Sequence, residues 1–560
     1  MMSHHNQFQH NDLCGLLCSH YSALEIWKRH LPNIIAASKH PDDSKFSHRE
    51  WTEKILRHFT PMILESKALV SETGKIIHGD SMDRIVGILR QKINAHNLRE
   101  NNESSIHRLK KKNGKTTGKS VESDQSTTID TTQPLKIAVV GGSITEGNGC
   151  SIAPVHIPKG SIMSNSIYCA WPYRFEQFIN NIAGFELIQV VNMAEDGTET
   201  ALMTPLLRNW VYPASLLPDG PDIVINAYST FDYINNEDND SGKKSSNPSI
   251  PYDKINEEME SFIDAIEASH PCGHTPLVVH LFDTSRSNNK VSRSLNEKKG
   301  STVISINYDD IVSKSATFDG IEHELKNDIT FGMSGHMLMT WILAYSFIEI
   351  LLNYCSTIAS KAGDIPKGNH LKDLDKSHTI FSKSVDMNAT NCKDASTGHD
   401  PCVFAWFAGP AGTVFKSYEI KKYITPFIVE NYNWETNTDM STGFSRKTGL
   451  IATAPGASII FEAKDITKEV QYINFMVLKS NLPKWDGGVA KFTVTVNEKD
   501  VPVKELSFEI DSTTTKTNPI TYPIEVDLKD YKAPVGSTLR FRVTLIEGQS
   551  FKILGMMFCS

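Results

Sequence analysis

The stretch Lys136-Ile-Ala-Val-Val-Gly-Gly-Ser-Ile-Thr-Glu-Gly-Asn-Gly-Cys150 decides the fold of this chain. Its apolar run from Ile137 to Val140 predicts a strand that is buried on both faces. The run leads directly into Gly141-Gly142-Ser143, and small residues at the carboxyl end of a buried strand are typical of the sites of open α/β sheets. We therefore expect a sharp turn that brings the hydroxyl of Ser143 to the rim of a parallel sheet. From this stretch alone, an ordinary turn with a serine helix cap fits equally well.

The bulk composition describes a large globular protein. The chain has 560 residues, enough for several domains with separate cores. Its formal net charge of −8 argues against nucleic acid as a partner, because no large basic field is available to hold phosphates. The first ten residues are polar and contain no apolar signal region, so a cytoplasmic location is the default expectation.

Two segments precede the decisive stretch. Residues 1–95 carry apolar side chains at helical spacings and predict a helical N-terminal region that includes Ser81 to Ala95. Residues 96–133 are polar and rich in Asn, Lys, Ser and Thr. Such a composition cannot bury a core, so we expect a disordered linker.

Residues 134–356 alternate apolar runs with amphipathic stretches, which predicts a parallel sheet covered by helices on both faces. The stretch Met337 to Cys355 approaches the length of a membrane span, but Glu349 and Asn353 interrupt it. We expect it to be a helix buried against the sheet, with no membrane span. The other elements expected here are strands at Phe185–Val191, Asp222–Tyr228, Pro276–Phe282 and Thr302–Ile306, and helices at Ala170–Ile182 and Glu257–Ser269.

The last part of the chain has a different pattern. Residues 357–400 are a polar connecting segment, and residues 401–560 hold short alternating strands separated by turn signals, which predicts an antiparallel β-sandwich. Two interpretations of Trp434 and Trp485 stay open: they line a carbohydrate-binding face, or they fill the core. The expected strands are Ser458–Glu462, Tyr472–Leu478, Ala490–Val496, Leu506–Ile510, Tyr522–Val526 and Thr538–Leu545.

Three loops follow successive predicted strands and should meet at one edge of the sheet: Gly142-Ser143, Asp196-Gly197-Thr198 and Ser229 to Asp232. Together they resemble the sequence blocks of the SGNH (GDSL-like) hydrolase superfamily over about residues 135–355. The first block matches at the serine after Gly142, and the second at Gly197 in the pattern Asn-x-x-x-x-Gly. The resemblance implies a flavodoxin-like three-layer α/β/α domain, here with a helical N-terminal region and a C-terminal β-domain.

The resemblance also implies the chemistry. Ser143 would be the nucleophile of acyl transfer, and the backbone N–H groups of Ser143 and Gly197 would form the oxyanion hole. The third block of the family carries an oxyanion-holding asparagine, where this chain has Phe231. Because phenylalanine donates no hydrogen bond, the oxyanion hole would lack one donor, a loss that typically costs about 10²–10³ in rate.

The fifth block of the family is Asp-x-x-His near the start of the last helix. Here Asn327 and Thr330 stand in those places, and a shift by one residue pairs Asp328 with Phe331. His336 is the nearest imidazole, so His336 is the candidate base and Asp328 the candidate orienting acid. His336 can also be read as a structural histidine at a helix N-terminus. His280 lies inside a strand pattern, where we expect a core residue with satisfied hydrogen bonds.

These features lead to two hypotheses. The first is a serine esterase that works through a Ser143 acyl-enzyme on a small-molecule or glycan ester, with acylated carbohydrate suggested by fold-level analogy. The second is a catalytically impaired domain that binds glycans or acts as a scaffold, motivated by Phe231 and Thr330. For the acyl-enzyme mechanism we expect no cofactor and no metal. A third hypothesis, a phosphate-binding glycine-rich loop, is disfavoured because no P-loop lysine follows the glycines. No pattern specifies an oligomeric state. One set of soft ligands matches no zinc-site spacing: His10, Cys14, Cys18 and His20.

Overall fold

The computed structural model describes part of the chain, and the helices expected before residue 80 lie outside it. The described residues are 80–112, 133–147, 170–194, 198–208, 217, 220–228, 252–268, 275–282, 303–308, 333–361, 402–407, 424–438, 448–467, 469–485, 487–497, 502–514 and 520–559.

A five-stranded parallel sheet with the order β2-β1-β3-β4-β5 forms the centre of the α/β part. Every neighbouring pair in this sheet is parallel, which confirms the parallel sheet that the sequence predicts. The strands are apolar on both faces because helices cover both sides. They are β1 (Leu135–Gly141), β2 (Ile188–Asn192), β3 (Ile223–Ala227), β4 (Leu277–Phe282) and β5 (Val303–Asn307).

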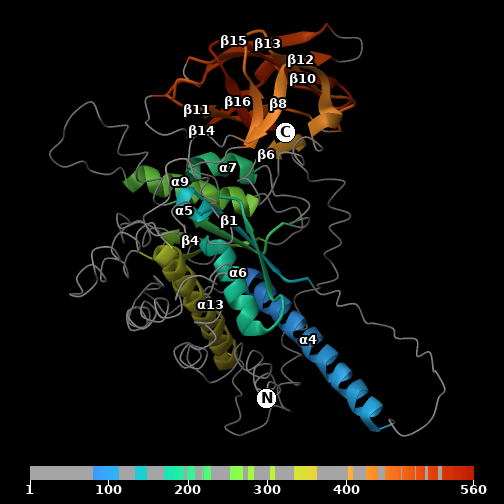
Figure 1. The fold of residues 1–560 in the computed structure, drawn as a ribbon, viewed down its shortest axis with the longest axis vertical. Helices are drawn as coiled ribbons and strands as arrows, with labels where there is room; N and C mark the ends of the chain where they lie inside the picture. Colours follow the sequence, from blue (N-terminus) through green and yellow to red (C-terminus); the bar gives the residue numbers. More distant parts are fainter. Residues whose placement is uncertain are drawn as a thin grey trace, which may run out of the picture.

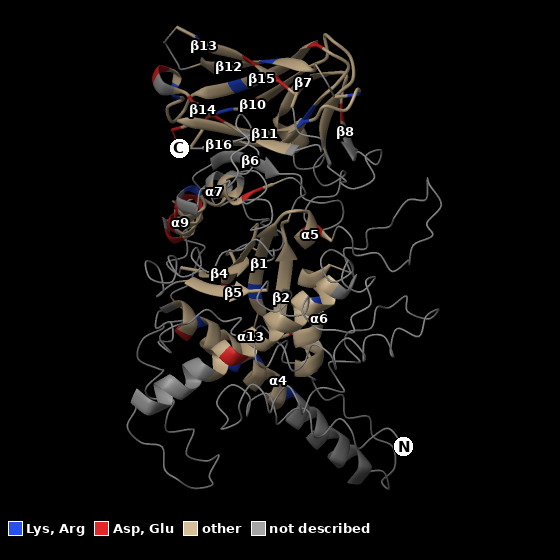
Figure 2. Cartoon of the chain, turned by 90° about the vertical axis from the view of Figure 1, so that its left-hand side faces the viewer, with Lys and Arg blue, Asp and Glu red and all other residues tan. Residues whose placement is uncertain are grey.

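The two faces of the sheet pack against different helices. On β1, Ile137 and Val139 belong to one hydrophobic cluster, and the alternate residues Ala138 and Val140 belong to another. The first cluster contains side chains of α4, α6 and α13, and the second those of α7 and α9. Figures 1 and 2 both show these groups on opposite sides of the sheet. The helices are α4 (Asp80–Lys112), α5 (Ser143–Glu146), α6 (Trp171–Ala183), α7 (Thr200–Arg208), α9 (Tyr252–Ala268) and α13 (Met333–Lys361).

Helix α4 is part of the α/β core and is longer than the sequence predicts. Its apolar residues, Met82 and Ile85 among them, pack in the same cluster as β1. Arg84 Nε lies 3.1 Å from Asp222 Oδ1, and the backbone N–H of Lys136 donates to Asp222 Oδ2 at 2.9 Å. The prediction of a disordered linker from residue 96 is wrong as far as Lys112, because a helix already formed at its packed end continues readily through Arg, Glu and Lys.

Helix α13 is the long apolar helix that the sequence predicts. Its window Gly335–Leu352 is long and apolar enough to cross a membrane, and 78% of that window is buried inside the protein. Trp341 and Leu338 are fully buried in the cluster that covers the sheet. The helix therefore serves as a core helix of this fold, as its sequence predicts.

The C-terminal part consists of two antiparallel sheets, with the orders β13-β12-β15-β10-β7 and β14-β11-β16-β9-β8, and β6 pairs with β16. Side chains from both sheets share one hydrophobic cluster around Phe475, Phe492 and Phe541, which is compatible with the predicted sandwich. The strands are β6 (Cys402–Phe407), β7 (Ile428–Tyr432), β8 (Trp434–Thr438), β9 (Thr448–Ala452), β10 (Ser458–Ala463), β11 (Tyr472–Lys479), β12 (Val489–Asn497), β13 (Lys504–Asp511), β14 (Ile520–Asp527), β15 (Thr538–Glu547) and β16 (Phe551–Cys559). Short 3₁₀ turns lie at Thr425–Phe427 and Lys529–Tyr531.

The hydrophobic cluster under α7 and α9 continues into the C-terminal sheets. It contains Met203 and Leu207 of α7 together with Met476, Leu554 and Met557 of strands β11 and β16. Figure 2 shows α7 and α9 between the parallel sheet and these strands. The α/β part and the C-terminal sheets are thus joined through an apolar junction on the α7/α9 side.

Candidate functional site

Ser143 lies where the sequence places it, at the carboxyl end of β1. Gly142 is the N-cap of the four-residue helix α5, and Ser143 is its first residue. The N–H of Glu146 donates to Gly142 O at 3.0 Å and closes the turn. The side chain of Ser143 is half-buried, whereas Gly142 and Ile144 on either side are buried. The Ser143 hydroxyl makes no hydrogen bond with another residue that the structure describes.

The glycine before this turn leaves room for the helix that carries Ser143. A Cβ atom on Gly141 would lie 2.5 Å from Thr145 Oγ1 and 2.6 Å from Thr145 Cβ. Such distances are far inside contact, so any side chain at position 141 displaces α5. Thr145 is fully buried, and its hydroxyl has no partner among the described residues.

The loop between β2 and α7 is bonded to this turn at both of its described ends. Asn192, the last residue of β2, donates from Nδ2 to Thr145 O at 2.9 Å and accepts the N–H of Ala194 at 3.0 Å. Thr198 donates from Oγ1 to Gly141 O at 3.3 Å. Gly197, the predicted second oxyanion donor, lies between these ends and outside the described residues, so its role stays a prediction.

A second asparagine, one residue before the end of β3, is bonded in a similar way. Asn226 on β3 donates from Nδ2 to Thr200 Oγ1 at 3.2 Å and accepts the N–H of Tyr228 at 3.1 Å. Ser229 to Asp232, including Phe231, lies outside the described part. Sequence reasoning missed the roles of Asn192 and Asn226. The available signal was a polar amide at or next to the last residue of two mainly apolar strands, where a buried donor and acceptor must find partners.

His336 lies inside α13 and is buried, with 1% of its surface exposed. Its Nδ1 accepts the backbone N–H of Trp171 at 3.3 Å, and Ala170 offers this helix start no side-chain cap. Thr340 donates to the carbonyl of His336 at 2.9 Å. The imidazole therefore satisfies a free N–H at the beginning of α6. In the neutral ring, an accepting Nδ1 puts the proton on Nε2.

The remaining predicted triad positions are not described: Asp328 and Thr330 lie outside the described residues. His280 is in the core as expected, but the prediction that its hydrogen bonds are satisfied is wrong. Neither ring nitrogen of His280 has a partner in the described structure. Phe262 and Phe282 lie beside the ring, and burial lowers the pKa of His280 to about 3.

The described residues contain no group of three or more His, Cys, Asp or Glu side chains that could hold a metal ion, and the cluster from His10 to His20 is outside them. An apolar cavity lies between the sheet and helices α4, α6 and α13, lined by residues such as Ile137, Phe175 and Leu343. It is on the face that packs against α4 and carries no polar lining residue, so it is a packing void and not a site for a polar substrate.

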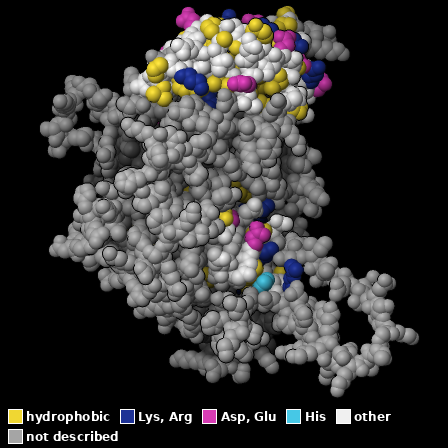
Figure 3. Space-filling model, viewed as in Figure 1, with side chains coloured by type: hydrophobic (Ala, Val, Ile, Leu, Met, Phe, Trp, Pro, Cys, Tyr) yellow, Lys and Arg dark blue, Asp and Glu magenta, His cyan; other side chains and the backbone are white. Residues whose placement is uncertain are grey.

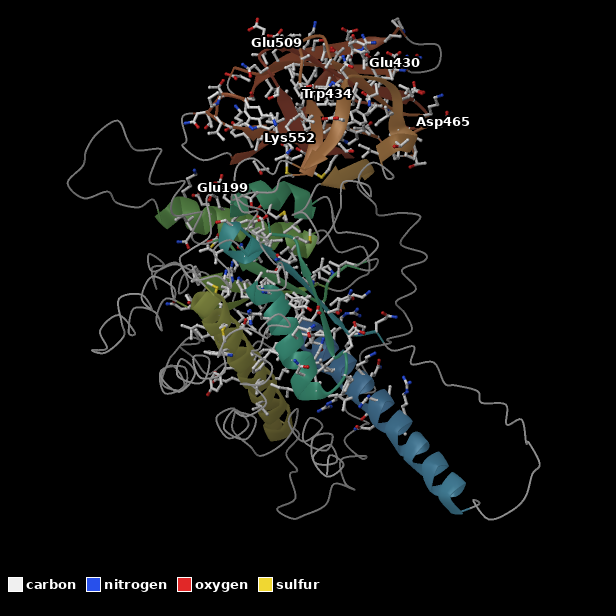
Figure 4. All side chains as sticks on the ribbon, viewed as in Figure 1. Glu199, Glu430, Trp434, Asp465, Glu509 and Lys552 are labelled. Atoms are coloured by element: carbon white, nitrogen blue, oxygen red, sulfur yellow. The ribbon has the colours of Figure 1, made fainter. Side chains whose placement is uncertain are left out.

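The carbohydrate-face interpretation of the two tryptophans is wrong for both. Trp434 is 4% exposed and Trp485 is 1% exposed, so neither ring is available to stack on a sugar at the surface. Lys552 is fully buried, with its Nζ 5.7 Å from the centre of the Trp485 ring. In Figure 4, Lys552 lies on the side of the C-terminal sheets nearest the α/β part, and Glu199 lies on the facing end of the α/β part.

The visible surface of the C-terminal sheets carries both signs of charge and scattered apolar side chains, as Figure 3 shows. The exposed aromatic residues described here include Tyr432 on β7 and Tyr522 on β14, and the ammonium of Lys479 lies 4.3 Å from the ring centre of Tyr522. These two tyrosines lie on edge strands of different sheets, so they do not share a sheet face.

No family model and no curated protein matches this chain. Among solved structures, the chain is similar to a two-domain esterase active on acetylated mannans (14% identity, 76% of this chain and 91% of the other, TM-score 0.38). It is also similar to a lipase from a goat rumen metagenome (15% identity, 37% and 95%, TM-score 0.27). TmCBM61 in complex with β-1,4-galactotriose matches with 14% identity over 24% of this chain and 90% of its own length, with a TM-score of 0.17. Similarities of this size assign neither a family nor an activity.

Proposed function

We propose that this chain is an SGNH-type serine esterase that removes acyl groups, with acylated carbohydrate as the substrate class. One observation carries the proposal. Ser143 is a half-buried serine without a described hydrogen-bond partner, and it follows the carboxyl end of β1, which lies between β2 and β3 in the parallel sheet. Its turn is bonded to the loop that follows the neighbouring strand. Sites of open α/β sheets lie at this edge.

The proposed reaction has two steps. Ser143 Oγ attacks the carbonyl carbon of the ester, a base takes the hydroxyl proton, and the alcohol leaves with that proton. Water then attacks the acyl carbon, a proton from the water passes through the base to Ser143 Oγ, and the carboxylic acid leaves. The N–H groups of Ser143 and Gly197 are the proposed donors to the oxyanion in both steps.

His336 is the proposed base and Asp328 its proposed orienting acid. This assignment requires His336 to give up its hydrogen bond with Trp171. A base must present an unprotonated nitrogen to Ser143. Because Nδ1 accepts the N–H of Trp171, the neutral ring carries its proton on Nε2. His336 therefore acts as the base only if the ring releases Trp171 and exchanges its tautomer on substrate binding.

The nucleophile is tested by comparing wild type with Ser143→Ala. We expect hydrolysis of a short-chain activated ester, and labelling by a fluorophosphonate, to fall by at least about 10³-fold in the variant. Equal rates in the two proteins would overturn the esterase proposal and leave the glycan-binding or scaffold alternative.

The base is tested by comparing His336→Asn with His336→Ala. Asparagine places an oxygen near the position of Nδ1, so it can still accept the N–H of Trp171, but it cannot take a proton. If His336 is the base, both variants lose Ser143 labelling. If His336→Asn labels at the wild-type rate and only His336→Ala loses stability, the histidine is a cap of α6 and the base assignment is wrong.

A further inference from the structure

We infer that Asn192 and Thr198 are positioning residues, which hold the helix of Ser143 in the orientation that acyl transfer requires. This inference rests on the proposed function, because it concerns the reactivity of Ser143. It gives a role to Asn192, which opens the second sequence block, and to Thr198, which follows Gly197; the sequence patterns assign neither side chain a role.

The two side chains donate hydrogen bonds to the backbone on either side of Ser143. Thr198 Oγ1 donates to Gly141 O, two residues before Ser143, and Asn192 Nδ2 donates to Thr145 O, two residues after it. A helix of four residues is too short to be stable by itself. The orientation of Ser143 therefore depends on bonds from outside α5, and these two come from the end of β2 and from the loop that follows it.

Both bonds are buried, so water does not replace them when they are lost. Asn192 is 8% exposed and Thr198 is 3% exposed. The carbonyl of Thr145 belongs to the last turn of α5, where carbonyl groups lack a partner within the helix. Asn192 supplies that partner and, through its acceptance of the Ala194 N–H, fixes the start of its own loop with the same side chain.

The opposite end of β2 offers a matched control. Asn180 donates from Nδ2 to Ile188 O at 2.9 Å and accepts the N–H groups of Leu187 and Ile188 at 2.8 and 2.9 Å. This is the same chemistry at the amino end of the same strand, away from α5. A substitution at Asn180 therefore reports what such a bond contributes to stability alone.

The first test changes each asparagine to aspartate. In both Asn192→Asp and Asn180→Asp the accepting oxygen is kept, and the donor is replaced by a carboxylate oxygen that faces a carbonyl. We expect fluorophosphonate labelling of Ser143 to slow about 100-fold in Asn192→Asp, the order of loss that a displacement near 1 Å produces. Asn180→Asp should lower the unfolding midpoint and label at the wild-type rate. Esterase assays should show the loss at Asn192 in kcat, with KM unchanged.

The second test covers the outcome in which Asn192→Asp fails to fold. Thr198→Val keeps the shape of the side chain and removes its hydrogen bond, and we expect about tenfold slower labelling. Thr198→Ser keeps the hydroxyl and should restore the rate. Labelling of Thr198→Val and of any folded Asn192→Asp at the wild-type rate would overturn the positioning role alone. Absence of labelling in wild type would overturn the proposed function, and the positioning role with it.

Discussion

The amino and carboxyl ends of the parallel sheet carry similar polar side chains that are used differently. At the amino end, Asp222 accepts bonds from Arg84 and from the Lys136 backbone, and the amide of Asn180 is bonded on both sides. At the carboxyl end, amides and hydroxyls also cross-link the loops, yet the hydroxyl groups of Ser143 and Thr145 have no partner among the described residues. The carboxyl end is also where open α/β sheets place their sites, so it is the end where we expect chemistry.

We expect the largest loss of stability when the ion pair between Arg84 and Asp222, at the amino end of the parallel sheet, is removed. In Arg84→Met the carboxylate of Asp222 stays buried without its cation, which typically costs about 3–5 kcal/mol of unfolding free energy. Burial already raises the pKa of Asp222, and Arg84 opposes that rise, so the variant pKa should be higher still. Denaturant unfolding measures the loss. Arg99→Met, an exposed arginine on the same helix, should change stability by less than about 0.5 kcal/mol. A loss below about 1 kcal/mol in Arg84→Met would show that α4 is not anchored at this end.

A substitution at the carboxyl end of the sheet should change the reactivity of Ser143. In Gly141→Ala the new Cβ meets Thr145 at 2.5 Å and displaces α5, so we expect labelling of Ser143 to slow about 100-fold. The control is Gly184→Ala at the amino end of β2, where φ is 80° and an alanine costs about 1 kcal/mol of stability. It should label at the wild-type rate. Equal labelling of both variants would mean that the two ends of the sheet do not differ in function.

The same contrast explains how much the sequence predicts. Buried strands such as Ile223–Ala227 and the long helix α13 follow from hydrophobic periodicity, because burial on both faces leaves an unmistakable apolar run. The alternation in β12 and β15 predicted the C-terminal strands for the same reason. The polar run after Ala95 does not predict the observed helix, since charged residues with good helix propensity also extend a helix that packing has already formed.

The site is less predictable than the fold because its bonds join residues far apart in the chain. The spacing between Asn192 and Thr145 carries no signal in either local pattern, and their contact exists only once β1 and β2 pair. Similarly, the sequence places His336 near a helix start but does not show that Trp171 supplies its partner. The sequence allows Trp434 and Trp485 either to bind carbohydrate or to fill the core, and only their burial in the structure decides for the core.

His280 lies between the amino and carboxyl ends of the parallel sheet, and it should make stability depend on pH. It lies in β4, with Asn226 and Ser305 as its register partners, and burial lowers its pKa to about 3. Below the ordinary pKa of about 6.5 the unfolded chain binds a proton that the folded chain does not, so stability falls as pH drops from about 6.5 towards 3, by up to about 1.4 kcal/mol per unit. The difference between the pH profiles of wild type and His280→Leu isolates this contribution. Parallel profiles would show that His280 is not held neutral.

The smallest effect should come from a polar cluster that belongs to neither end of the parallel sheet. Glu462 on β10 accepts a hydrogen bond from Arg540 on β15, and its carboxylate lies 3.1 Å from Lys464 Nζ. Burial alone would raise the pKa of Glu462, but the hydrogen bonds from Arg540 and Lys464 lower it below its ordinary value. The stability that this adds is present above the ordinary pKa and is lost as pH falls through the lowered one.

Because Lys464 is 70% exposed and Arg540 remains, Lys464→Ala should lower the unfolding free energy by less than about 1 kcal/mol, and by less still at high salt. Ser143 labelling should not change. A slower labelling rate in this variant would mean that the C-terminal sheets transmit changes through the apolar junction at α7, and that the reactive end of the sheet is not set by its own loops alone.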